Sequence, residues 1–418
     1  MRERISTRGF VTALVFCFLA AGVLARAAED KCLECHNGIT PGIVADWKAS
    51  AHAAAGVSCD ACHGDKHTTI DDTQNAVIPT PDTCAPCHKE QVEQFKRGKH
   101  AKAWEAMKAM PTFHWQPMAF TEGMKGCGGC HKIGLKTDAE LKELIKTKPG
   151  YGVASCDSCH TRHLFSKAEA LQPQACQTCH MGFDHAQWEM YSSSKHGVRF
   201  LMKQGKIIPD SVPAPSCQSC HIANGNHENR TAWGFLGVRL PMPEDKSWAD
   251  DRTVILQALG VLDPEGNPTT RLEAVKQNDM VRLTEESWQE RRQAMVKQCA
   301  QCHSRELVEQ ELKKDDGMIR EADRLMAEAI RLVAGLYQDK LIPKPAQYAY
   351  AFPDVLTFHD AATPVEQRLF VMFEEYRMRT FQGAFHMNPD YTFWYGWSGL
   401  KQALTDIKSM AEDLRRKK

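Results

Sequence analysis

The pentapeptide Cys-x-x-Cys-His occurs eight times in this chain of 418 residues, and this repetition constrains the fold more than any other feature. The cysteine pairs are Cys32 and Cys35, Cys59 and Cys62, Cys84 and Cys87, Cys127 and Cys130, Cys156 and Cys159, Cys176 and Cys179, Cys217 and Cys220, and Cys299 and Cys302. The histidines that follow them are His36, His63, His88, His131, His160, His180, His221 and His303. Of the 17 cysteines, only Cys17 lies outside these motifs.

The chemistry of the motif predicts its ligand. Two thiols three residues apart on a helical turn can add to the two vinyl groups of one heme, and the histidine that follows then binds the iron. Cysteine pairs also hold zinc or form redox-active disulfides. Neither alternative explains why a histidine follows the second cysteine in every motif. The sequence therefore predicts eight covalently bound c-type hemes, each with its iron on one of these histidines.

The N-terminal segment, residues 1–27, has the pattern of a secretory signal peptide. Basic residues precede an apolar run from Phe10 to Leu24, and small residues follow up to Ala27. Fifteen apolar residues fall short of the roughly 20 that a membrane-spanning helix needs, so a cleaved signal is favoured over an uncleaved anchor. We expect an exported protein, periplasmic or on the outer side of the membrane.

Composition narrows the partners and the fold class. The chain carries 52 basic and 52 acidic residues, so its balanced charge gives no indication of a nucleic-acid partner. Porphyrins supply much of the apolar surface that a core needs, so the peptide between motifs can be rich in loops. We expect a mainly α fold with almost no sheet, a loop-rich cytochrome c core over 28–304 and a helical C-terminal region over 305–418. Apolar spacing in that region predicts helices over 321–340, 365–387 and 398–415.

Ten further histidines are candidates for the second axial position of each iron. Sequence context favours seven of them as distal ligands: His52, His67, His100, His163, His196, His227 and His386. Three of these seven follow an aromatic residue at helical distance (Trp47 before His52, Phe95 before His100, Tyr191 before His196), which suggests one structural device used three times. His114 and His359 are expected at the surface or beside the ligands. His185 stands apart because it directly follows Asp184.

Two segments resemble a known family. The sixth motif continues as Met181-Gly182-Phe183-Asp184-His185-Ala186-Gln187-Trp188, and the seventh as Asn226-His227-Glu228 followed by Arg230-Thr231-Ala232-Trp233-Gly234-Phe235. With the eight motifs, these segments resemble the octaheme hydroxylamine oxidoreductases from about Cys32 to His303. The resemblance implies that the heme on His131 is catalytic with an open distal face, that Asp184 and His185 stand over it, and that the chain forms a homotrimer. Oxidation or reduction of a nitrogen–oxygen compound moves protons with electrons, which is work suited to a carboxylate and an imidazole.

The family divides according to reaction direction. Its hydroxylamine and hydrazine oxidisers carry a tyrosine from a neighbouring subunit that is bonded to the catalytic heme, whereas relatives without this bond tend to reduce nitrite. Here about 115 residues follow the eighth motif, a short region that contains Tyr391 and Tyr395. We expect no tyrosine–heme bond and a preference for nitrite reduction, with hydroxylamine or hydrazine oxidation as the alternative. Electrons would be exchanged with a cytochrome or a quinol-linked carrier.

Two other functions remain open at this level. In a non-catalytic electron carrier, all eight hemes would be six-coordinate and His185 would be an iron ligand. Octaheme reductases of sulfur oxyanions commonly vary one heme motif or its proximal ligand, and no such variation occurs among the eight motifs here.

Overall fold

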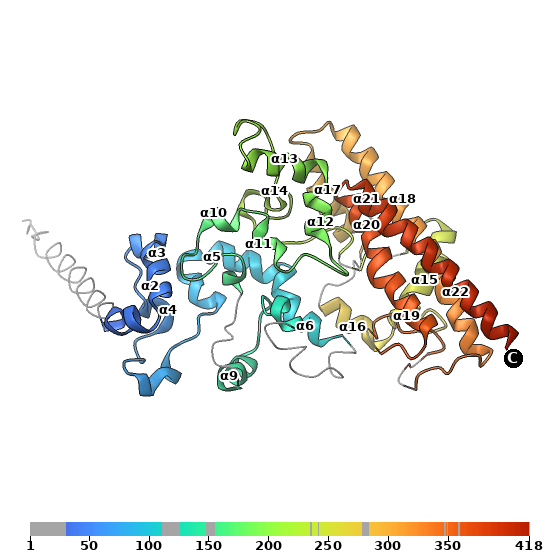
Figure 1. The fold of residues 1–418 in the computed structure, drawn as a ribbon, viewed down its shortest axis with the longest axis horizontal. Coiled ribbons are helices and arrows are strands. Elements are labelled where there is room, and N and C mark those ends of the chain that lie inside the picture. Colours follow the sequence, from blue (N-terminus) through green and yellow to red (C-terminus); the bar gives the residue numbers. More distant parts are fainter. Residues whose placement is uncertain are drawn as a thin grey trace, which may run out of the picture. The chain divides into compact units, whose positions relative to one another are not determined.

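A computed structural model describes residues 31–110, 126–147, 155–277 and 284–417, apart from 235, 241, 347, 349, 358 and 359 (Figure 1). The predicted signal peptide, His114 and His359 lie outside the described residues. None of the helices described has both the length and the apolar character that crossing a membrane requires.

The chain divides into two compact units whose boundaries interleave along the sequence. The first unit is Met1–Val92 with Thr137–Leu171, and the second is Glu93–Lys136 with Gln172–Lys418. Motifs one, two, three and five therefore belong to the first unit, and motifs four, six, seven and eight belong to the second. The predicted domain boundary at residue 304 is based on where the heme motifs end and helical apolar spacing begins, and it stays a prediction.

The first unit consists of short helices joined by turns. After a helical segment over 31–39 come α2 (Pro41–Lys48), α3 (Ala51–Ala54), α4 (Asp60–His63), η1 (Ile70–Asn75), the first part of α5 (Pro81–Arg97), α9 (Asp138–Thr147), η4 (Cys156–Ser158) and α10 (Lys167–Ala170). The elements begin and end at motif residues, turns and serine caps, and the isolated segments are too short to be stable without further packing.

The heme-bearing part of the second unit has the same character. It contains η2 (His100–Lys102), α6 (Ala103–Lys108), α8 (Cys127–His131), α11 (Gln174–Gln177), α12 (Gln187–Ser192), α13 (Lys195–Gln204), α14 (Cys217–His221) and η5 (Ala223–Gly225). Longer helices follow, namely α15 (Lys246–Ala258), α16 (Thr270–Gln277) and α17 (Glu285–Cys299).

Long helices make up the C-terminal region, as the apolar spacing predicts. The helix predicted over 321–340 is part of α18 (Arg305–Gln338), which begins at Ser304 because the Ser304 hydroxyl accepts a hydrogen bond from the Leu307 amide. The segment predicted over 365–387 is observed as α19 (Pro364–Val371), the π-helical η6 (Met372–Arg377) and α20 (Met378–Phe385). The last helices are α21 (Pro389–Thr392), the π-helical η7 (Phe393–Ser398) and α22 (Gly399–Arg416).

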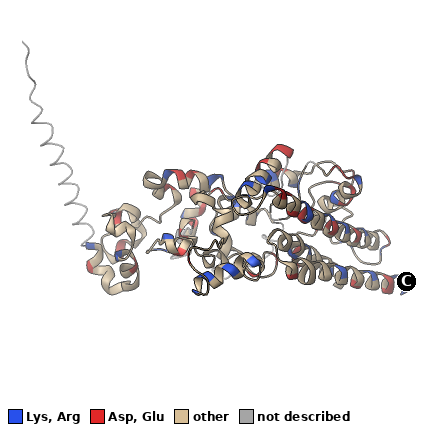
Figure 2. Cartoon of the chain, turned by 90° about the horizontal axis from the view of Figure 1, so that it is seen from above, with Lys and Arg blue, Asp and Glu red and all other residues tan. Residues whose placement is uncertain are grey.

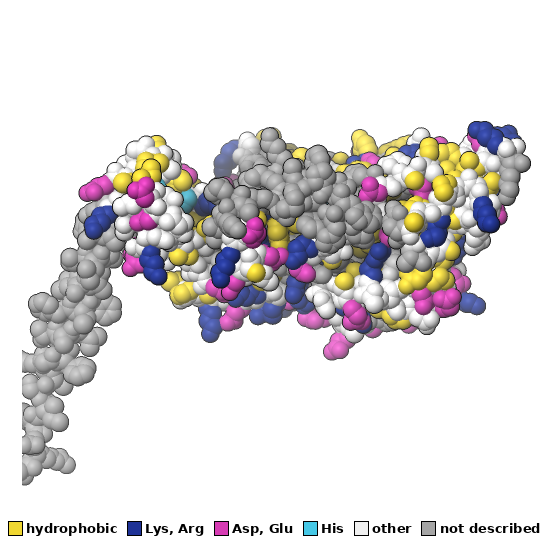
Figure 3. Space-filling view, turned by 90° about the horizontal axis from the view of Figure 1, so that it is seen from below, with side chains coloured by type: hydrophobic (Ala, Val, Ile, Leu, Met, Phe, Trp, Pro, Cys, Tyr) yellow, Lys and Arg dark blue, Asp and Glu magenta, His cyan; other side chains and the backbone are white. Residues whose placement is uncertain are grey.

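The predicted fold class is confirmed. Across the described ranges the chain is helical, and the extended pairing consists of one isolated bridge between Leu262 and Pro268. Acidic and basic residues are interspersed along the C-terminal helices (Figure 2). Hydrophobic side chains also reach the surface of this region (Figure 3), and Trp394 and Tyr395 of η7 are 65% and 54% exposed.

The core of the second unit lies between α15, α18, the α19–α20 segment and α22. Ile255, Ile330, Phe373 and Leu400, one from each of these segments, are fully buried in it. Among these apolar residues lies a charged cluster of Arg252, Asp323 and Arg377, each with 0% exposure.

Asp323 is the centre of that cluster. One carboxylate oxygen accepts hydrogen bonds from Arg252 and from the Trp248 indole at 2.8 Å, and the other accepts from Arg377 at 2.9 and 3.1 Å. Both guanidinium groups also donate to the Gly237 carbonyl. The cluster thus joins α15, α18, η6 and the loop before α15 through bonds that leave the aspartate fully paired.

We predict that Asp323→Ala lowers the free energy of unfolding by about 3–5 kcal/mol, because it leaves two buried guanidinium groups without their counter-charge. Chemical denaturation of the heme-loaded protein measures this loss. Asp413→Ala is the matched control, because Asp413 pairs with Arg416 at the surface and its loss should change stability by less than about 1 kcal/mol. Equal effects of the two substitutions would contradict the role assigned to Asp323.

Candidate heme sites and a catalytic pair

In motifs two, four and seven, a short helix ends at the motif histidine. Asp60–His63, Cys127–His131 and Cys217–His221 are complete short helices of this kind. In α5 the third motif lies inside a longer helix that kinks at His88, where φ is −115° and ψ is 42°. None of the sixteen cysteines in the described ranges forms a disulfide, which keeps each pair available for thioether bonds.

Six motif histidines face a second imidazole across a gap of nearly constant width. The distances between ring centroids are 6.2 Å for His36 and His67, 6.0 Å for His63 and His163, 6.1 Å for His88 and His52, 6.1 Å for His180 and His100, 6.3 Å for His221 and His386, and 6.1 Å for His303 and His196. These pairs bring together six of the seven predicted distal ligands with six different motifs.

This spacing fits an iron ion between the rings. A metal–imidazole bond of about 2 Å on each side, with about 1 Å from nitrogen to ring centre, separates two coaxial ligands by roughly 6 Å. The residues present therefore fit bis-histidine hemes, the arrangement expected of electron-transfer sites.

Hydrogen bonds set the tautomer of several of these rings. The Nδ1 atoms of His63, His131 and His386 lie 3.0, 2.8 and 2.7 Å from the carbonyl oxygens of Val77, Ala103 and Gln382. Because a carbonyl oxygen only accepts, the proton sits on Nδ1 and the unprotonated Nε2 is left to bind a metal.

Desolvation acts in the same direction. It lowers the pKa of His100 and of His386 below the ordinary value, and it lowers the pKa of His221 to about 4. A neutral imidazole is the form that binds iron, so these sites favour the ligating state before any heme is considered.

Contacts between cysteines show which motifs are neighbours. In the first unit Cys32 interacts with Cys59, Cys62 with Cys84, and Cys84 with Cys156, so the order of neighbours is motifs one, two, three and five. In the second unit the corresponding contacts are Cys130 with Cys179, Cys176 with Cys217, and Cys220 with Cys299, which gives the order four, six, seven and eight. Each unit therefore holds four attachment sites in a chain of close neighbours.

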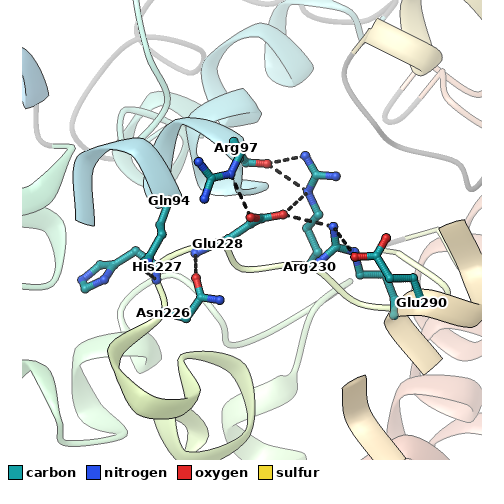
Figure 4. Close-up of polar contacts among 8 residues, drawn as sticks. Gln94, Arg97, Asn226, His227, Glu228, Arg230 and Glu290 are labelled. Carbon is teal, nitrogen blue, oxygen red and sulfur yellow. Dashed lines mark hydrogen bonds and ion pairs between the residues drawn. The ribbon is translucent and has the colours of Figure 1, made fainter. Parts of the chain in front are cut away.

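His227 is held by two hydrogen bonds and lies next to Glu228, which is surrounded by arginines (Figure 4). Its amide donates to the Gln94 side chain at 3.0 Å, and its Nδ1 donates to the Gly225 carbonyl at 2.7 Å. The next residue, Glu228, accepts hydrogen bonds from Arg97 and Arg291, both at 3.0 Å. Burial opposes ionisation of Glu228, but these arginines outweigh it and lower the pKa of Glu228. His227 as a distal heme ligand stays a prediction.

The recurring context of His52, His100 and His196 is realised in two of the three places. Ser50 and Ser194 cap the helices that carry His52 and His196, so those imidazoles occupy the same helical position. His100 instead begins η2, where no side chain caps the helix. All three histidines face a motif histidine, but they do so from two different local structures.

His131 differs from the six paired histidines. Among the described residues no second imidazole faces His131 at ring-contact distance, whereas Asp184 and His185 both act on it electrostatically. Asp184 is hydrogen-bonded to Nδ1 of His185, and their side chains are 24% and 30% exposed. Burial alone would lower the pKa of His185, but the hydrogen bond and the charge of Asp184 outweigh it and raise that pKa. The structure thus brings a paired carboxylate and imidazole close to the fourth motif.

Contacts with the C-terminal helices hold the segment that carries this pair. Phe183 stacks on Phe370 of α19 with ring centroids 6.2 Å apart, and the Gln187 amide donates to Gln382 of α20 at 2.8 Å. The side chain of Asn388 donates to the Met190 carbonyl at 2.7 Å. The short region after the eighth motif therefore positions Asp184 and His185.

A second placement of His185 remains compatible with its geometry. Its ring centroid lies 6.2 Å from that of His180, the same spacing as in the ligand pairs, with the rings at 87°. His180 also faces His100 at 6.1 Å. Burial lowers the pKa of His100, which favours its neutral form. His100 therefore fits the second iron ligand opposite His180 better than His185 does.

Sequence reasoning missed Glu374 of η6. Its side chain is completely buried and interacts electrostatically with Asp184. The available signal was a carboxylate directly after the apolar run from Leu369 to Phe373, a position where burial without a partner is costly.

Comparisons with known proteins agree with these sites. A family model described as "Seven times multi-haem cytochrome CxxCH" matches residues 28–252 and 270–347. A probable nitrite reductase-hydroxylamine oxidoreductase fusion protein of Kuenenia stuttgartiensis is 27% identical over 95% of this chain and 53% of its own length. The multiheme cytochrome MtrA of Shewanella baltica (strain OS185) is 26% identical over 49% of this chain and 59% of its own length. The chain thus spans little more than half the length of these relatives.

Solved structures show the same fold. One chain of a reducing HAO-like protein complex of Kuenenia stuttgartiensis superposes with a TM-score of 0.71 at 24% identity, covering 94% of this chain and 87% of that one. A hypothetical multiheme protein superposes with a TM-score of 0.67 at 21% identity, covering 93% and 96%.

The attachment motifs, the spacing of the imidazoles and these comparisons define a multiheme c-type cytochrome with covalently bound hemes. The chain belongs to the multi-haem cytochrome CxxCH family, and the predicted resemblance to the hydroxylamine oxidoreductase family is confirmed.

We predict that His386→Ala converts one low-spin heme to high-spin, because it removes the imidazole opposite His221. Electron paramagnetic resonance of the oxidised protein measures the change. His227→Ala should give a second, separate high-spin heme, and a variant at His185 should give none. A fully low-spin spectrum for His386→Ala would contradict the ligand assignment.

Proposed function

We propose that this chain is an exported octaheme oxidoreductase that converts small nitrogen compounds, hydroxylamine or nitrite, at the heme on His131. The observation that carries the proposal is the contrast between His131 and the six paired motif histidines, together with the Asp184–His185 pair beside it. The other seven motifs would hold electron-transfer hemes. The names of the Kuenenia relatives support this substrate class.

The protein residues would manage protons and orientation at this site. A heme held by His131 would supply the place where the substrate exchanges electrons. Asp184 orients His185 through its Nδ1 and stabilises the protonated imidazole, which directs Nε2 as the proton donor or acceptor for the substrate oxygen or nitrogen. His131 donates a hydrogen bond from Nδ1 to the Ala103 carbonyl, which would leave its Nε2 free to bind the heme iron.

We predict that Asp184→Asn or His185→Ala lowers turnover by about 100- to 10,000-fold, the usual contribution of general acid–base catalysis. Heme content and low-spin spectra should be unchanged. Steady-state nitrite and hydroxylamine assays measure the effect, with Asp210→Asn as a control because Asp210 pairs with Lys206 at the surface. Conversion of a low-spin heme to high-spin by His185→Ala would show that His185 is an iron ligand.

That outcome would favour a second candidate, a non-catalytic electron carrier. The observation in its favour is the 6.2 Å spacing between His185 and His180. The absorption spectrum of the reduced protein with and without carbon monoxide separates the two functions. An open heme binds carbon monoxide and shifts its absorption, whereas eight six-coordinate hemes leave the spectrum unchanged.

We further propose that the physiological direction is nitrite reduction without a tyrosine–heme bond, in a homotrimer that exchanges electrons with a cytochrome or a quinol-linked carrier. Tyr391 and Tyr395 contact each other within the chain, with ring centroids 5.0 Å apart. The exposed Trp394 and Tyr395 offer an apolar surface for a second copy. Hydroxylamine oxidation is the alternative direction.

We predict that intact mass spectrometry of the denatured mature protein gives one polypeptide plus eight hemes, and no multiple of that mass. An undistorted porphyrin better delivers electrons to bound substrate, so nitrite should be reduced faster than hydroxylamine is oxidised. Covalent multimers would return the chain to the oxidising branch. Fewer heme masses would overturn the octaheme assignment.

A further inference from the structure

The segment from His63 to Val77 carries ligands for two different hemes. His63 is the motif histidine of the second attachment site, and His67 faces His36 of the first site with ring centroids 6.2 Å apart. The ends of the segment are joined, because the Val77 amide donates to the His63 carbonyl at 2.8 Å. The four residues from His63 to His67 span at most roughly 14 Å, so this segment keeps the first two heme sites close together.

The two histidines on this segment are hydrogen-bonded to acceptors of different charge. Nδ1 of His67 donates to the Asp72 carboxylate at 2.8 Å, and these two side chains are 27% and 22% exposed. Nδ1 of His63 instead donates to the neutral Val77 carbonyl at 3.0 Å. The segment thus places a negative charge behind one heme ligand and a neutral dipole behind the other.

Asp72 is held in place for this contact by the residues that follow His67. The amides of Thr68 and Thr69 donate to Oδ1 at 2.9 and 3.0 Å, and the Thr68 hydroxyl donates to Oδ2 at 2.9 Å. An ionised carboxylate has acceptor sites on both oxygens and can take all of these bonds together with that of His67. The position of the acceptor is therefore fixed by the same turn that carries the ligand.

A carboxylate behind a ligating histidine changes the metal as well as the ring. The bond from Nδ1 leaves Nε2 of His67 free to bind iron, and it makes this imidazole a more basic ligand. A more basic ligand stabilises ferric iron more than ferrous iron, and hydrogen bonds of this kind are one of the means by which proteins set heme potentials. A carbonyl acceptor, as at His63, has this effect to a smaller degree because it carries no full charge.

We propose that Asp72 is a positioning residue that acts through His67 and makes the heme on His36 a stronger reductant than the heme on His63. An electron that a cytochrome or a quinol-linked carrier gives to the first site would then move on to the second. In that step the iron between His36 and His67 is oxidised from ferrous to ferric, and the iron between His63 and His163 is reduced from ferric to ferrous. No bond is made or broken. The inference goes beyond the proposed function, because it does not depend on the substrate.

The test is a redox titration of the full-length, heme-loaded protein, followed by electron paramagnetic resonance. Two variants assign the signals, because His67→Ala removes the low-spin signal of the first heme and His163→Ala removes that of the second. In the wild type we expect the first heme to be reduced at a lower potential than the second. A first heme with an equal or higher potential would overturn the proposal.

Asp72→Asn tests the role of the carboxylate, because it preserves the shape of the side chain and an acceptor oxygen but removes the charge. At a fixed potential, we expect the ratio of reduced to oxidised first heme to rise about tenfold, an upward shift of about 59 mV for one electron. The potential of the second heme should stay the same.

Asp71→Asn is the matched control. Asp71 is the neighbouring carboxylate on η1 and is exposed, so its loss removes the same formal charge while the bond between Asp72 and His67 remains. Its effect on the potential of the first heme should be clearly smaller. A shift in Asp72→Asn that is no larger than the shift in Asp71→Asn would overturn the role of Asp72.

The experiment decides the inference even where a variant fails. If Asp72→Asn does not incorporate hemes, the order of the two potentials in the wild type remains the deciding measurement. Neither readout uses turnover, so loss of the proposed role of Asp184 and His185 would leave this inference standing. Equal potentials at the first two hemes would in turn leave the catalytic proposal untouched.

Discussion

The organisation of this protein depends on pairs of imidazoles held about 6 Å apart. Each pair places one histidine from an attachment motif against a second from a different segment, so every iron would join two parts of the chain. The bond between His221 and His386 would tie the seventh motif to the end of α20, far along the sequence. Coordination of this kind supplies long-range constraints that the short helices cannot supply through packing alone.

His131 differs from the six motif histidines that face a second imidazole. It lies close to a carboxylate–imidazole pair, and we propose that this pair prepares the fourth attachment site for chemistry. The C-terminal helices contribute to that preparation, because Phe370, Gln382 and Asn388 hold the segment that carries Asp184 and His185. Stability of the helical core and geometry of the site are therefore linked through the same residues.

Much of the site could be predicted from the sequence because covalent chemistry fixes it locally. The attachment motifs are contiguous, and six of the seven candidate distal histidines follow aromatic anchors or motifs at short distances. Which histidine faces which motif depends on long-range packing, so pairs such as His163 with His63 could not be read from spacing. The helix predicted over 365–387 is observed, but apolar spacing did not predict its π-helical turn, which contains the buried Glu374 and Arg377. Because Ser304 caps α18, this helix begins at Arg305, well before the predicted start at residue 321.

The interleaving of the two units has a consequence for biosynthesis. A chain that crosses the membrane from its N-terminus presents the fourth motif before the fifth, yet the fifth completes the first unit. If the chain is exported in this way, the segment that carries the fourth motif would cross before the segment from Gln172 onward that completes its unit. Heme attachment to Cys127 and Cys130 would then take place on a chain that has not yet folded around them. No single cut in the gene separates the two units, each of which contains four attachment motifs.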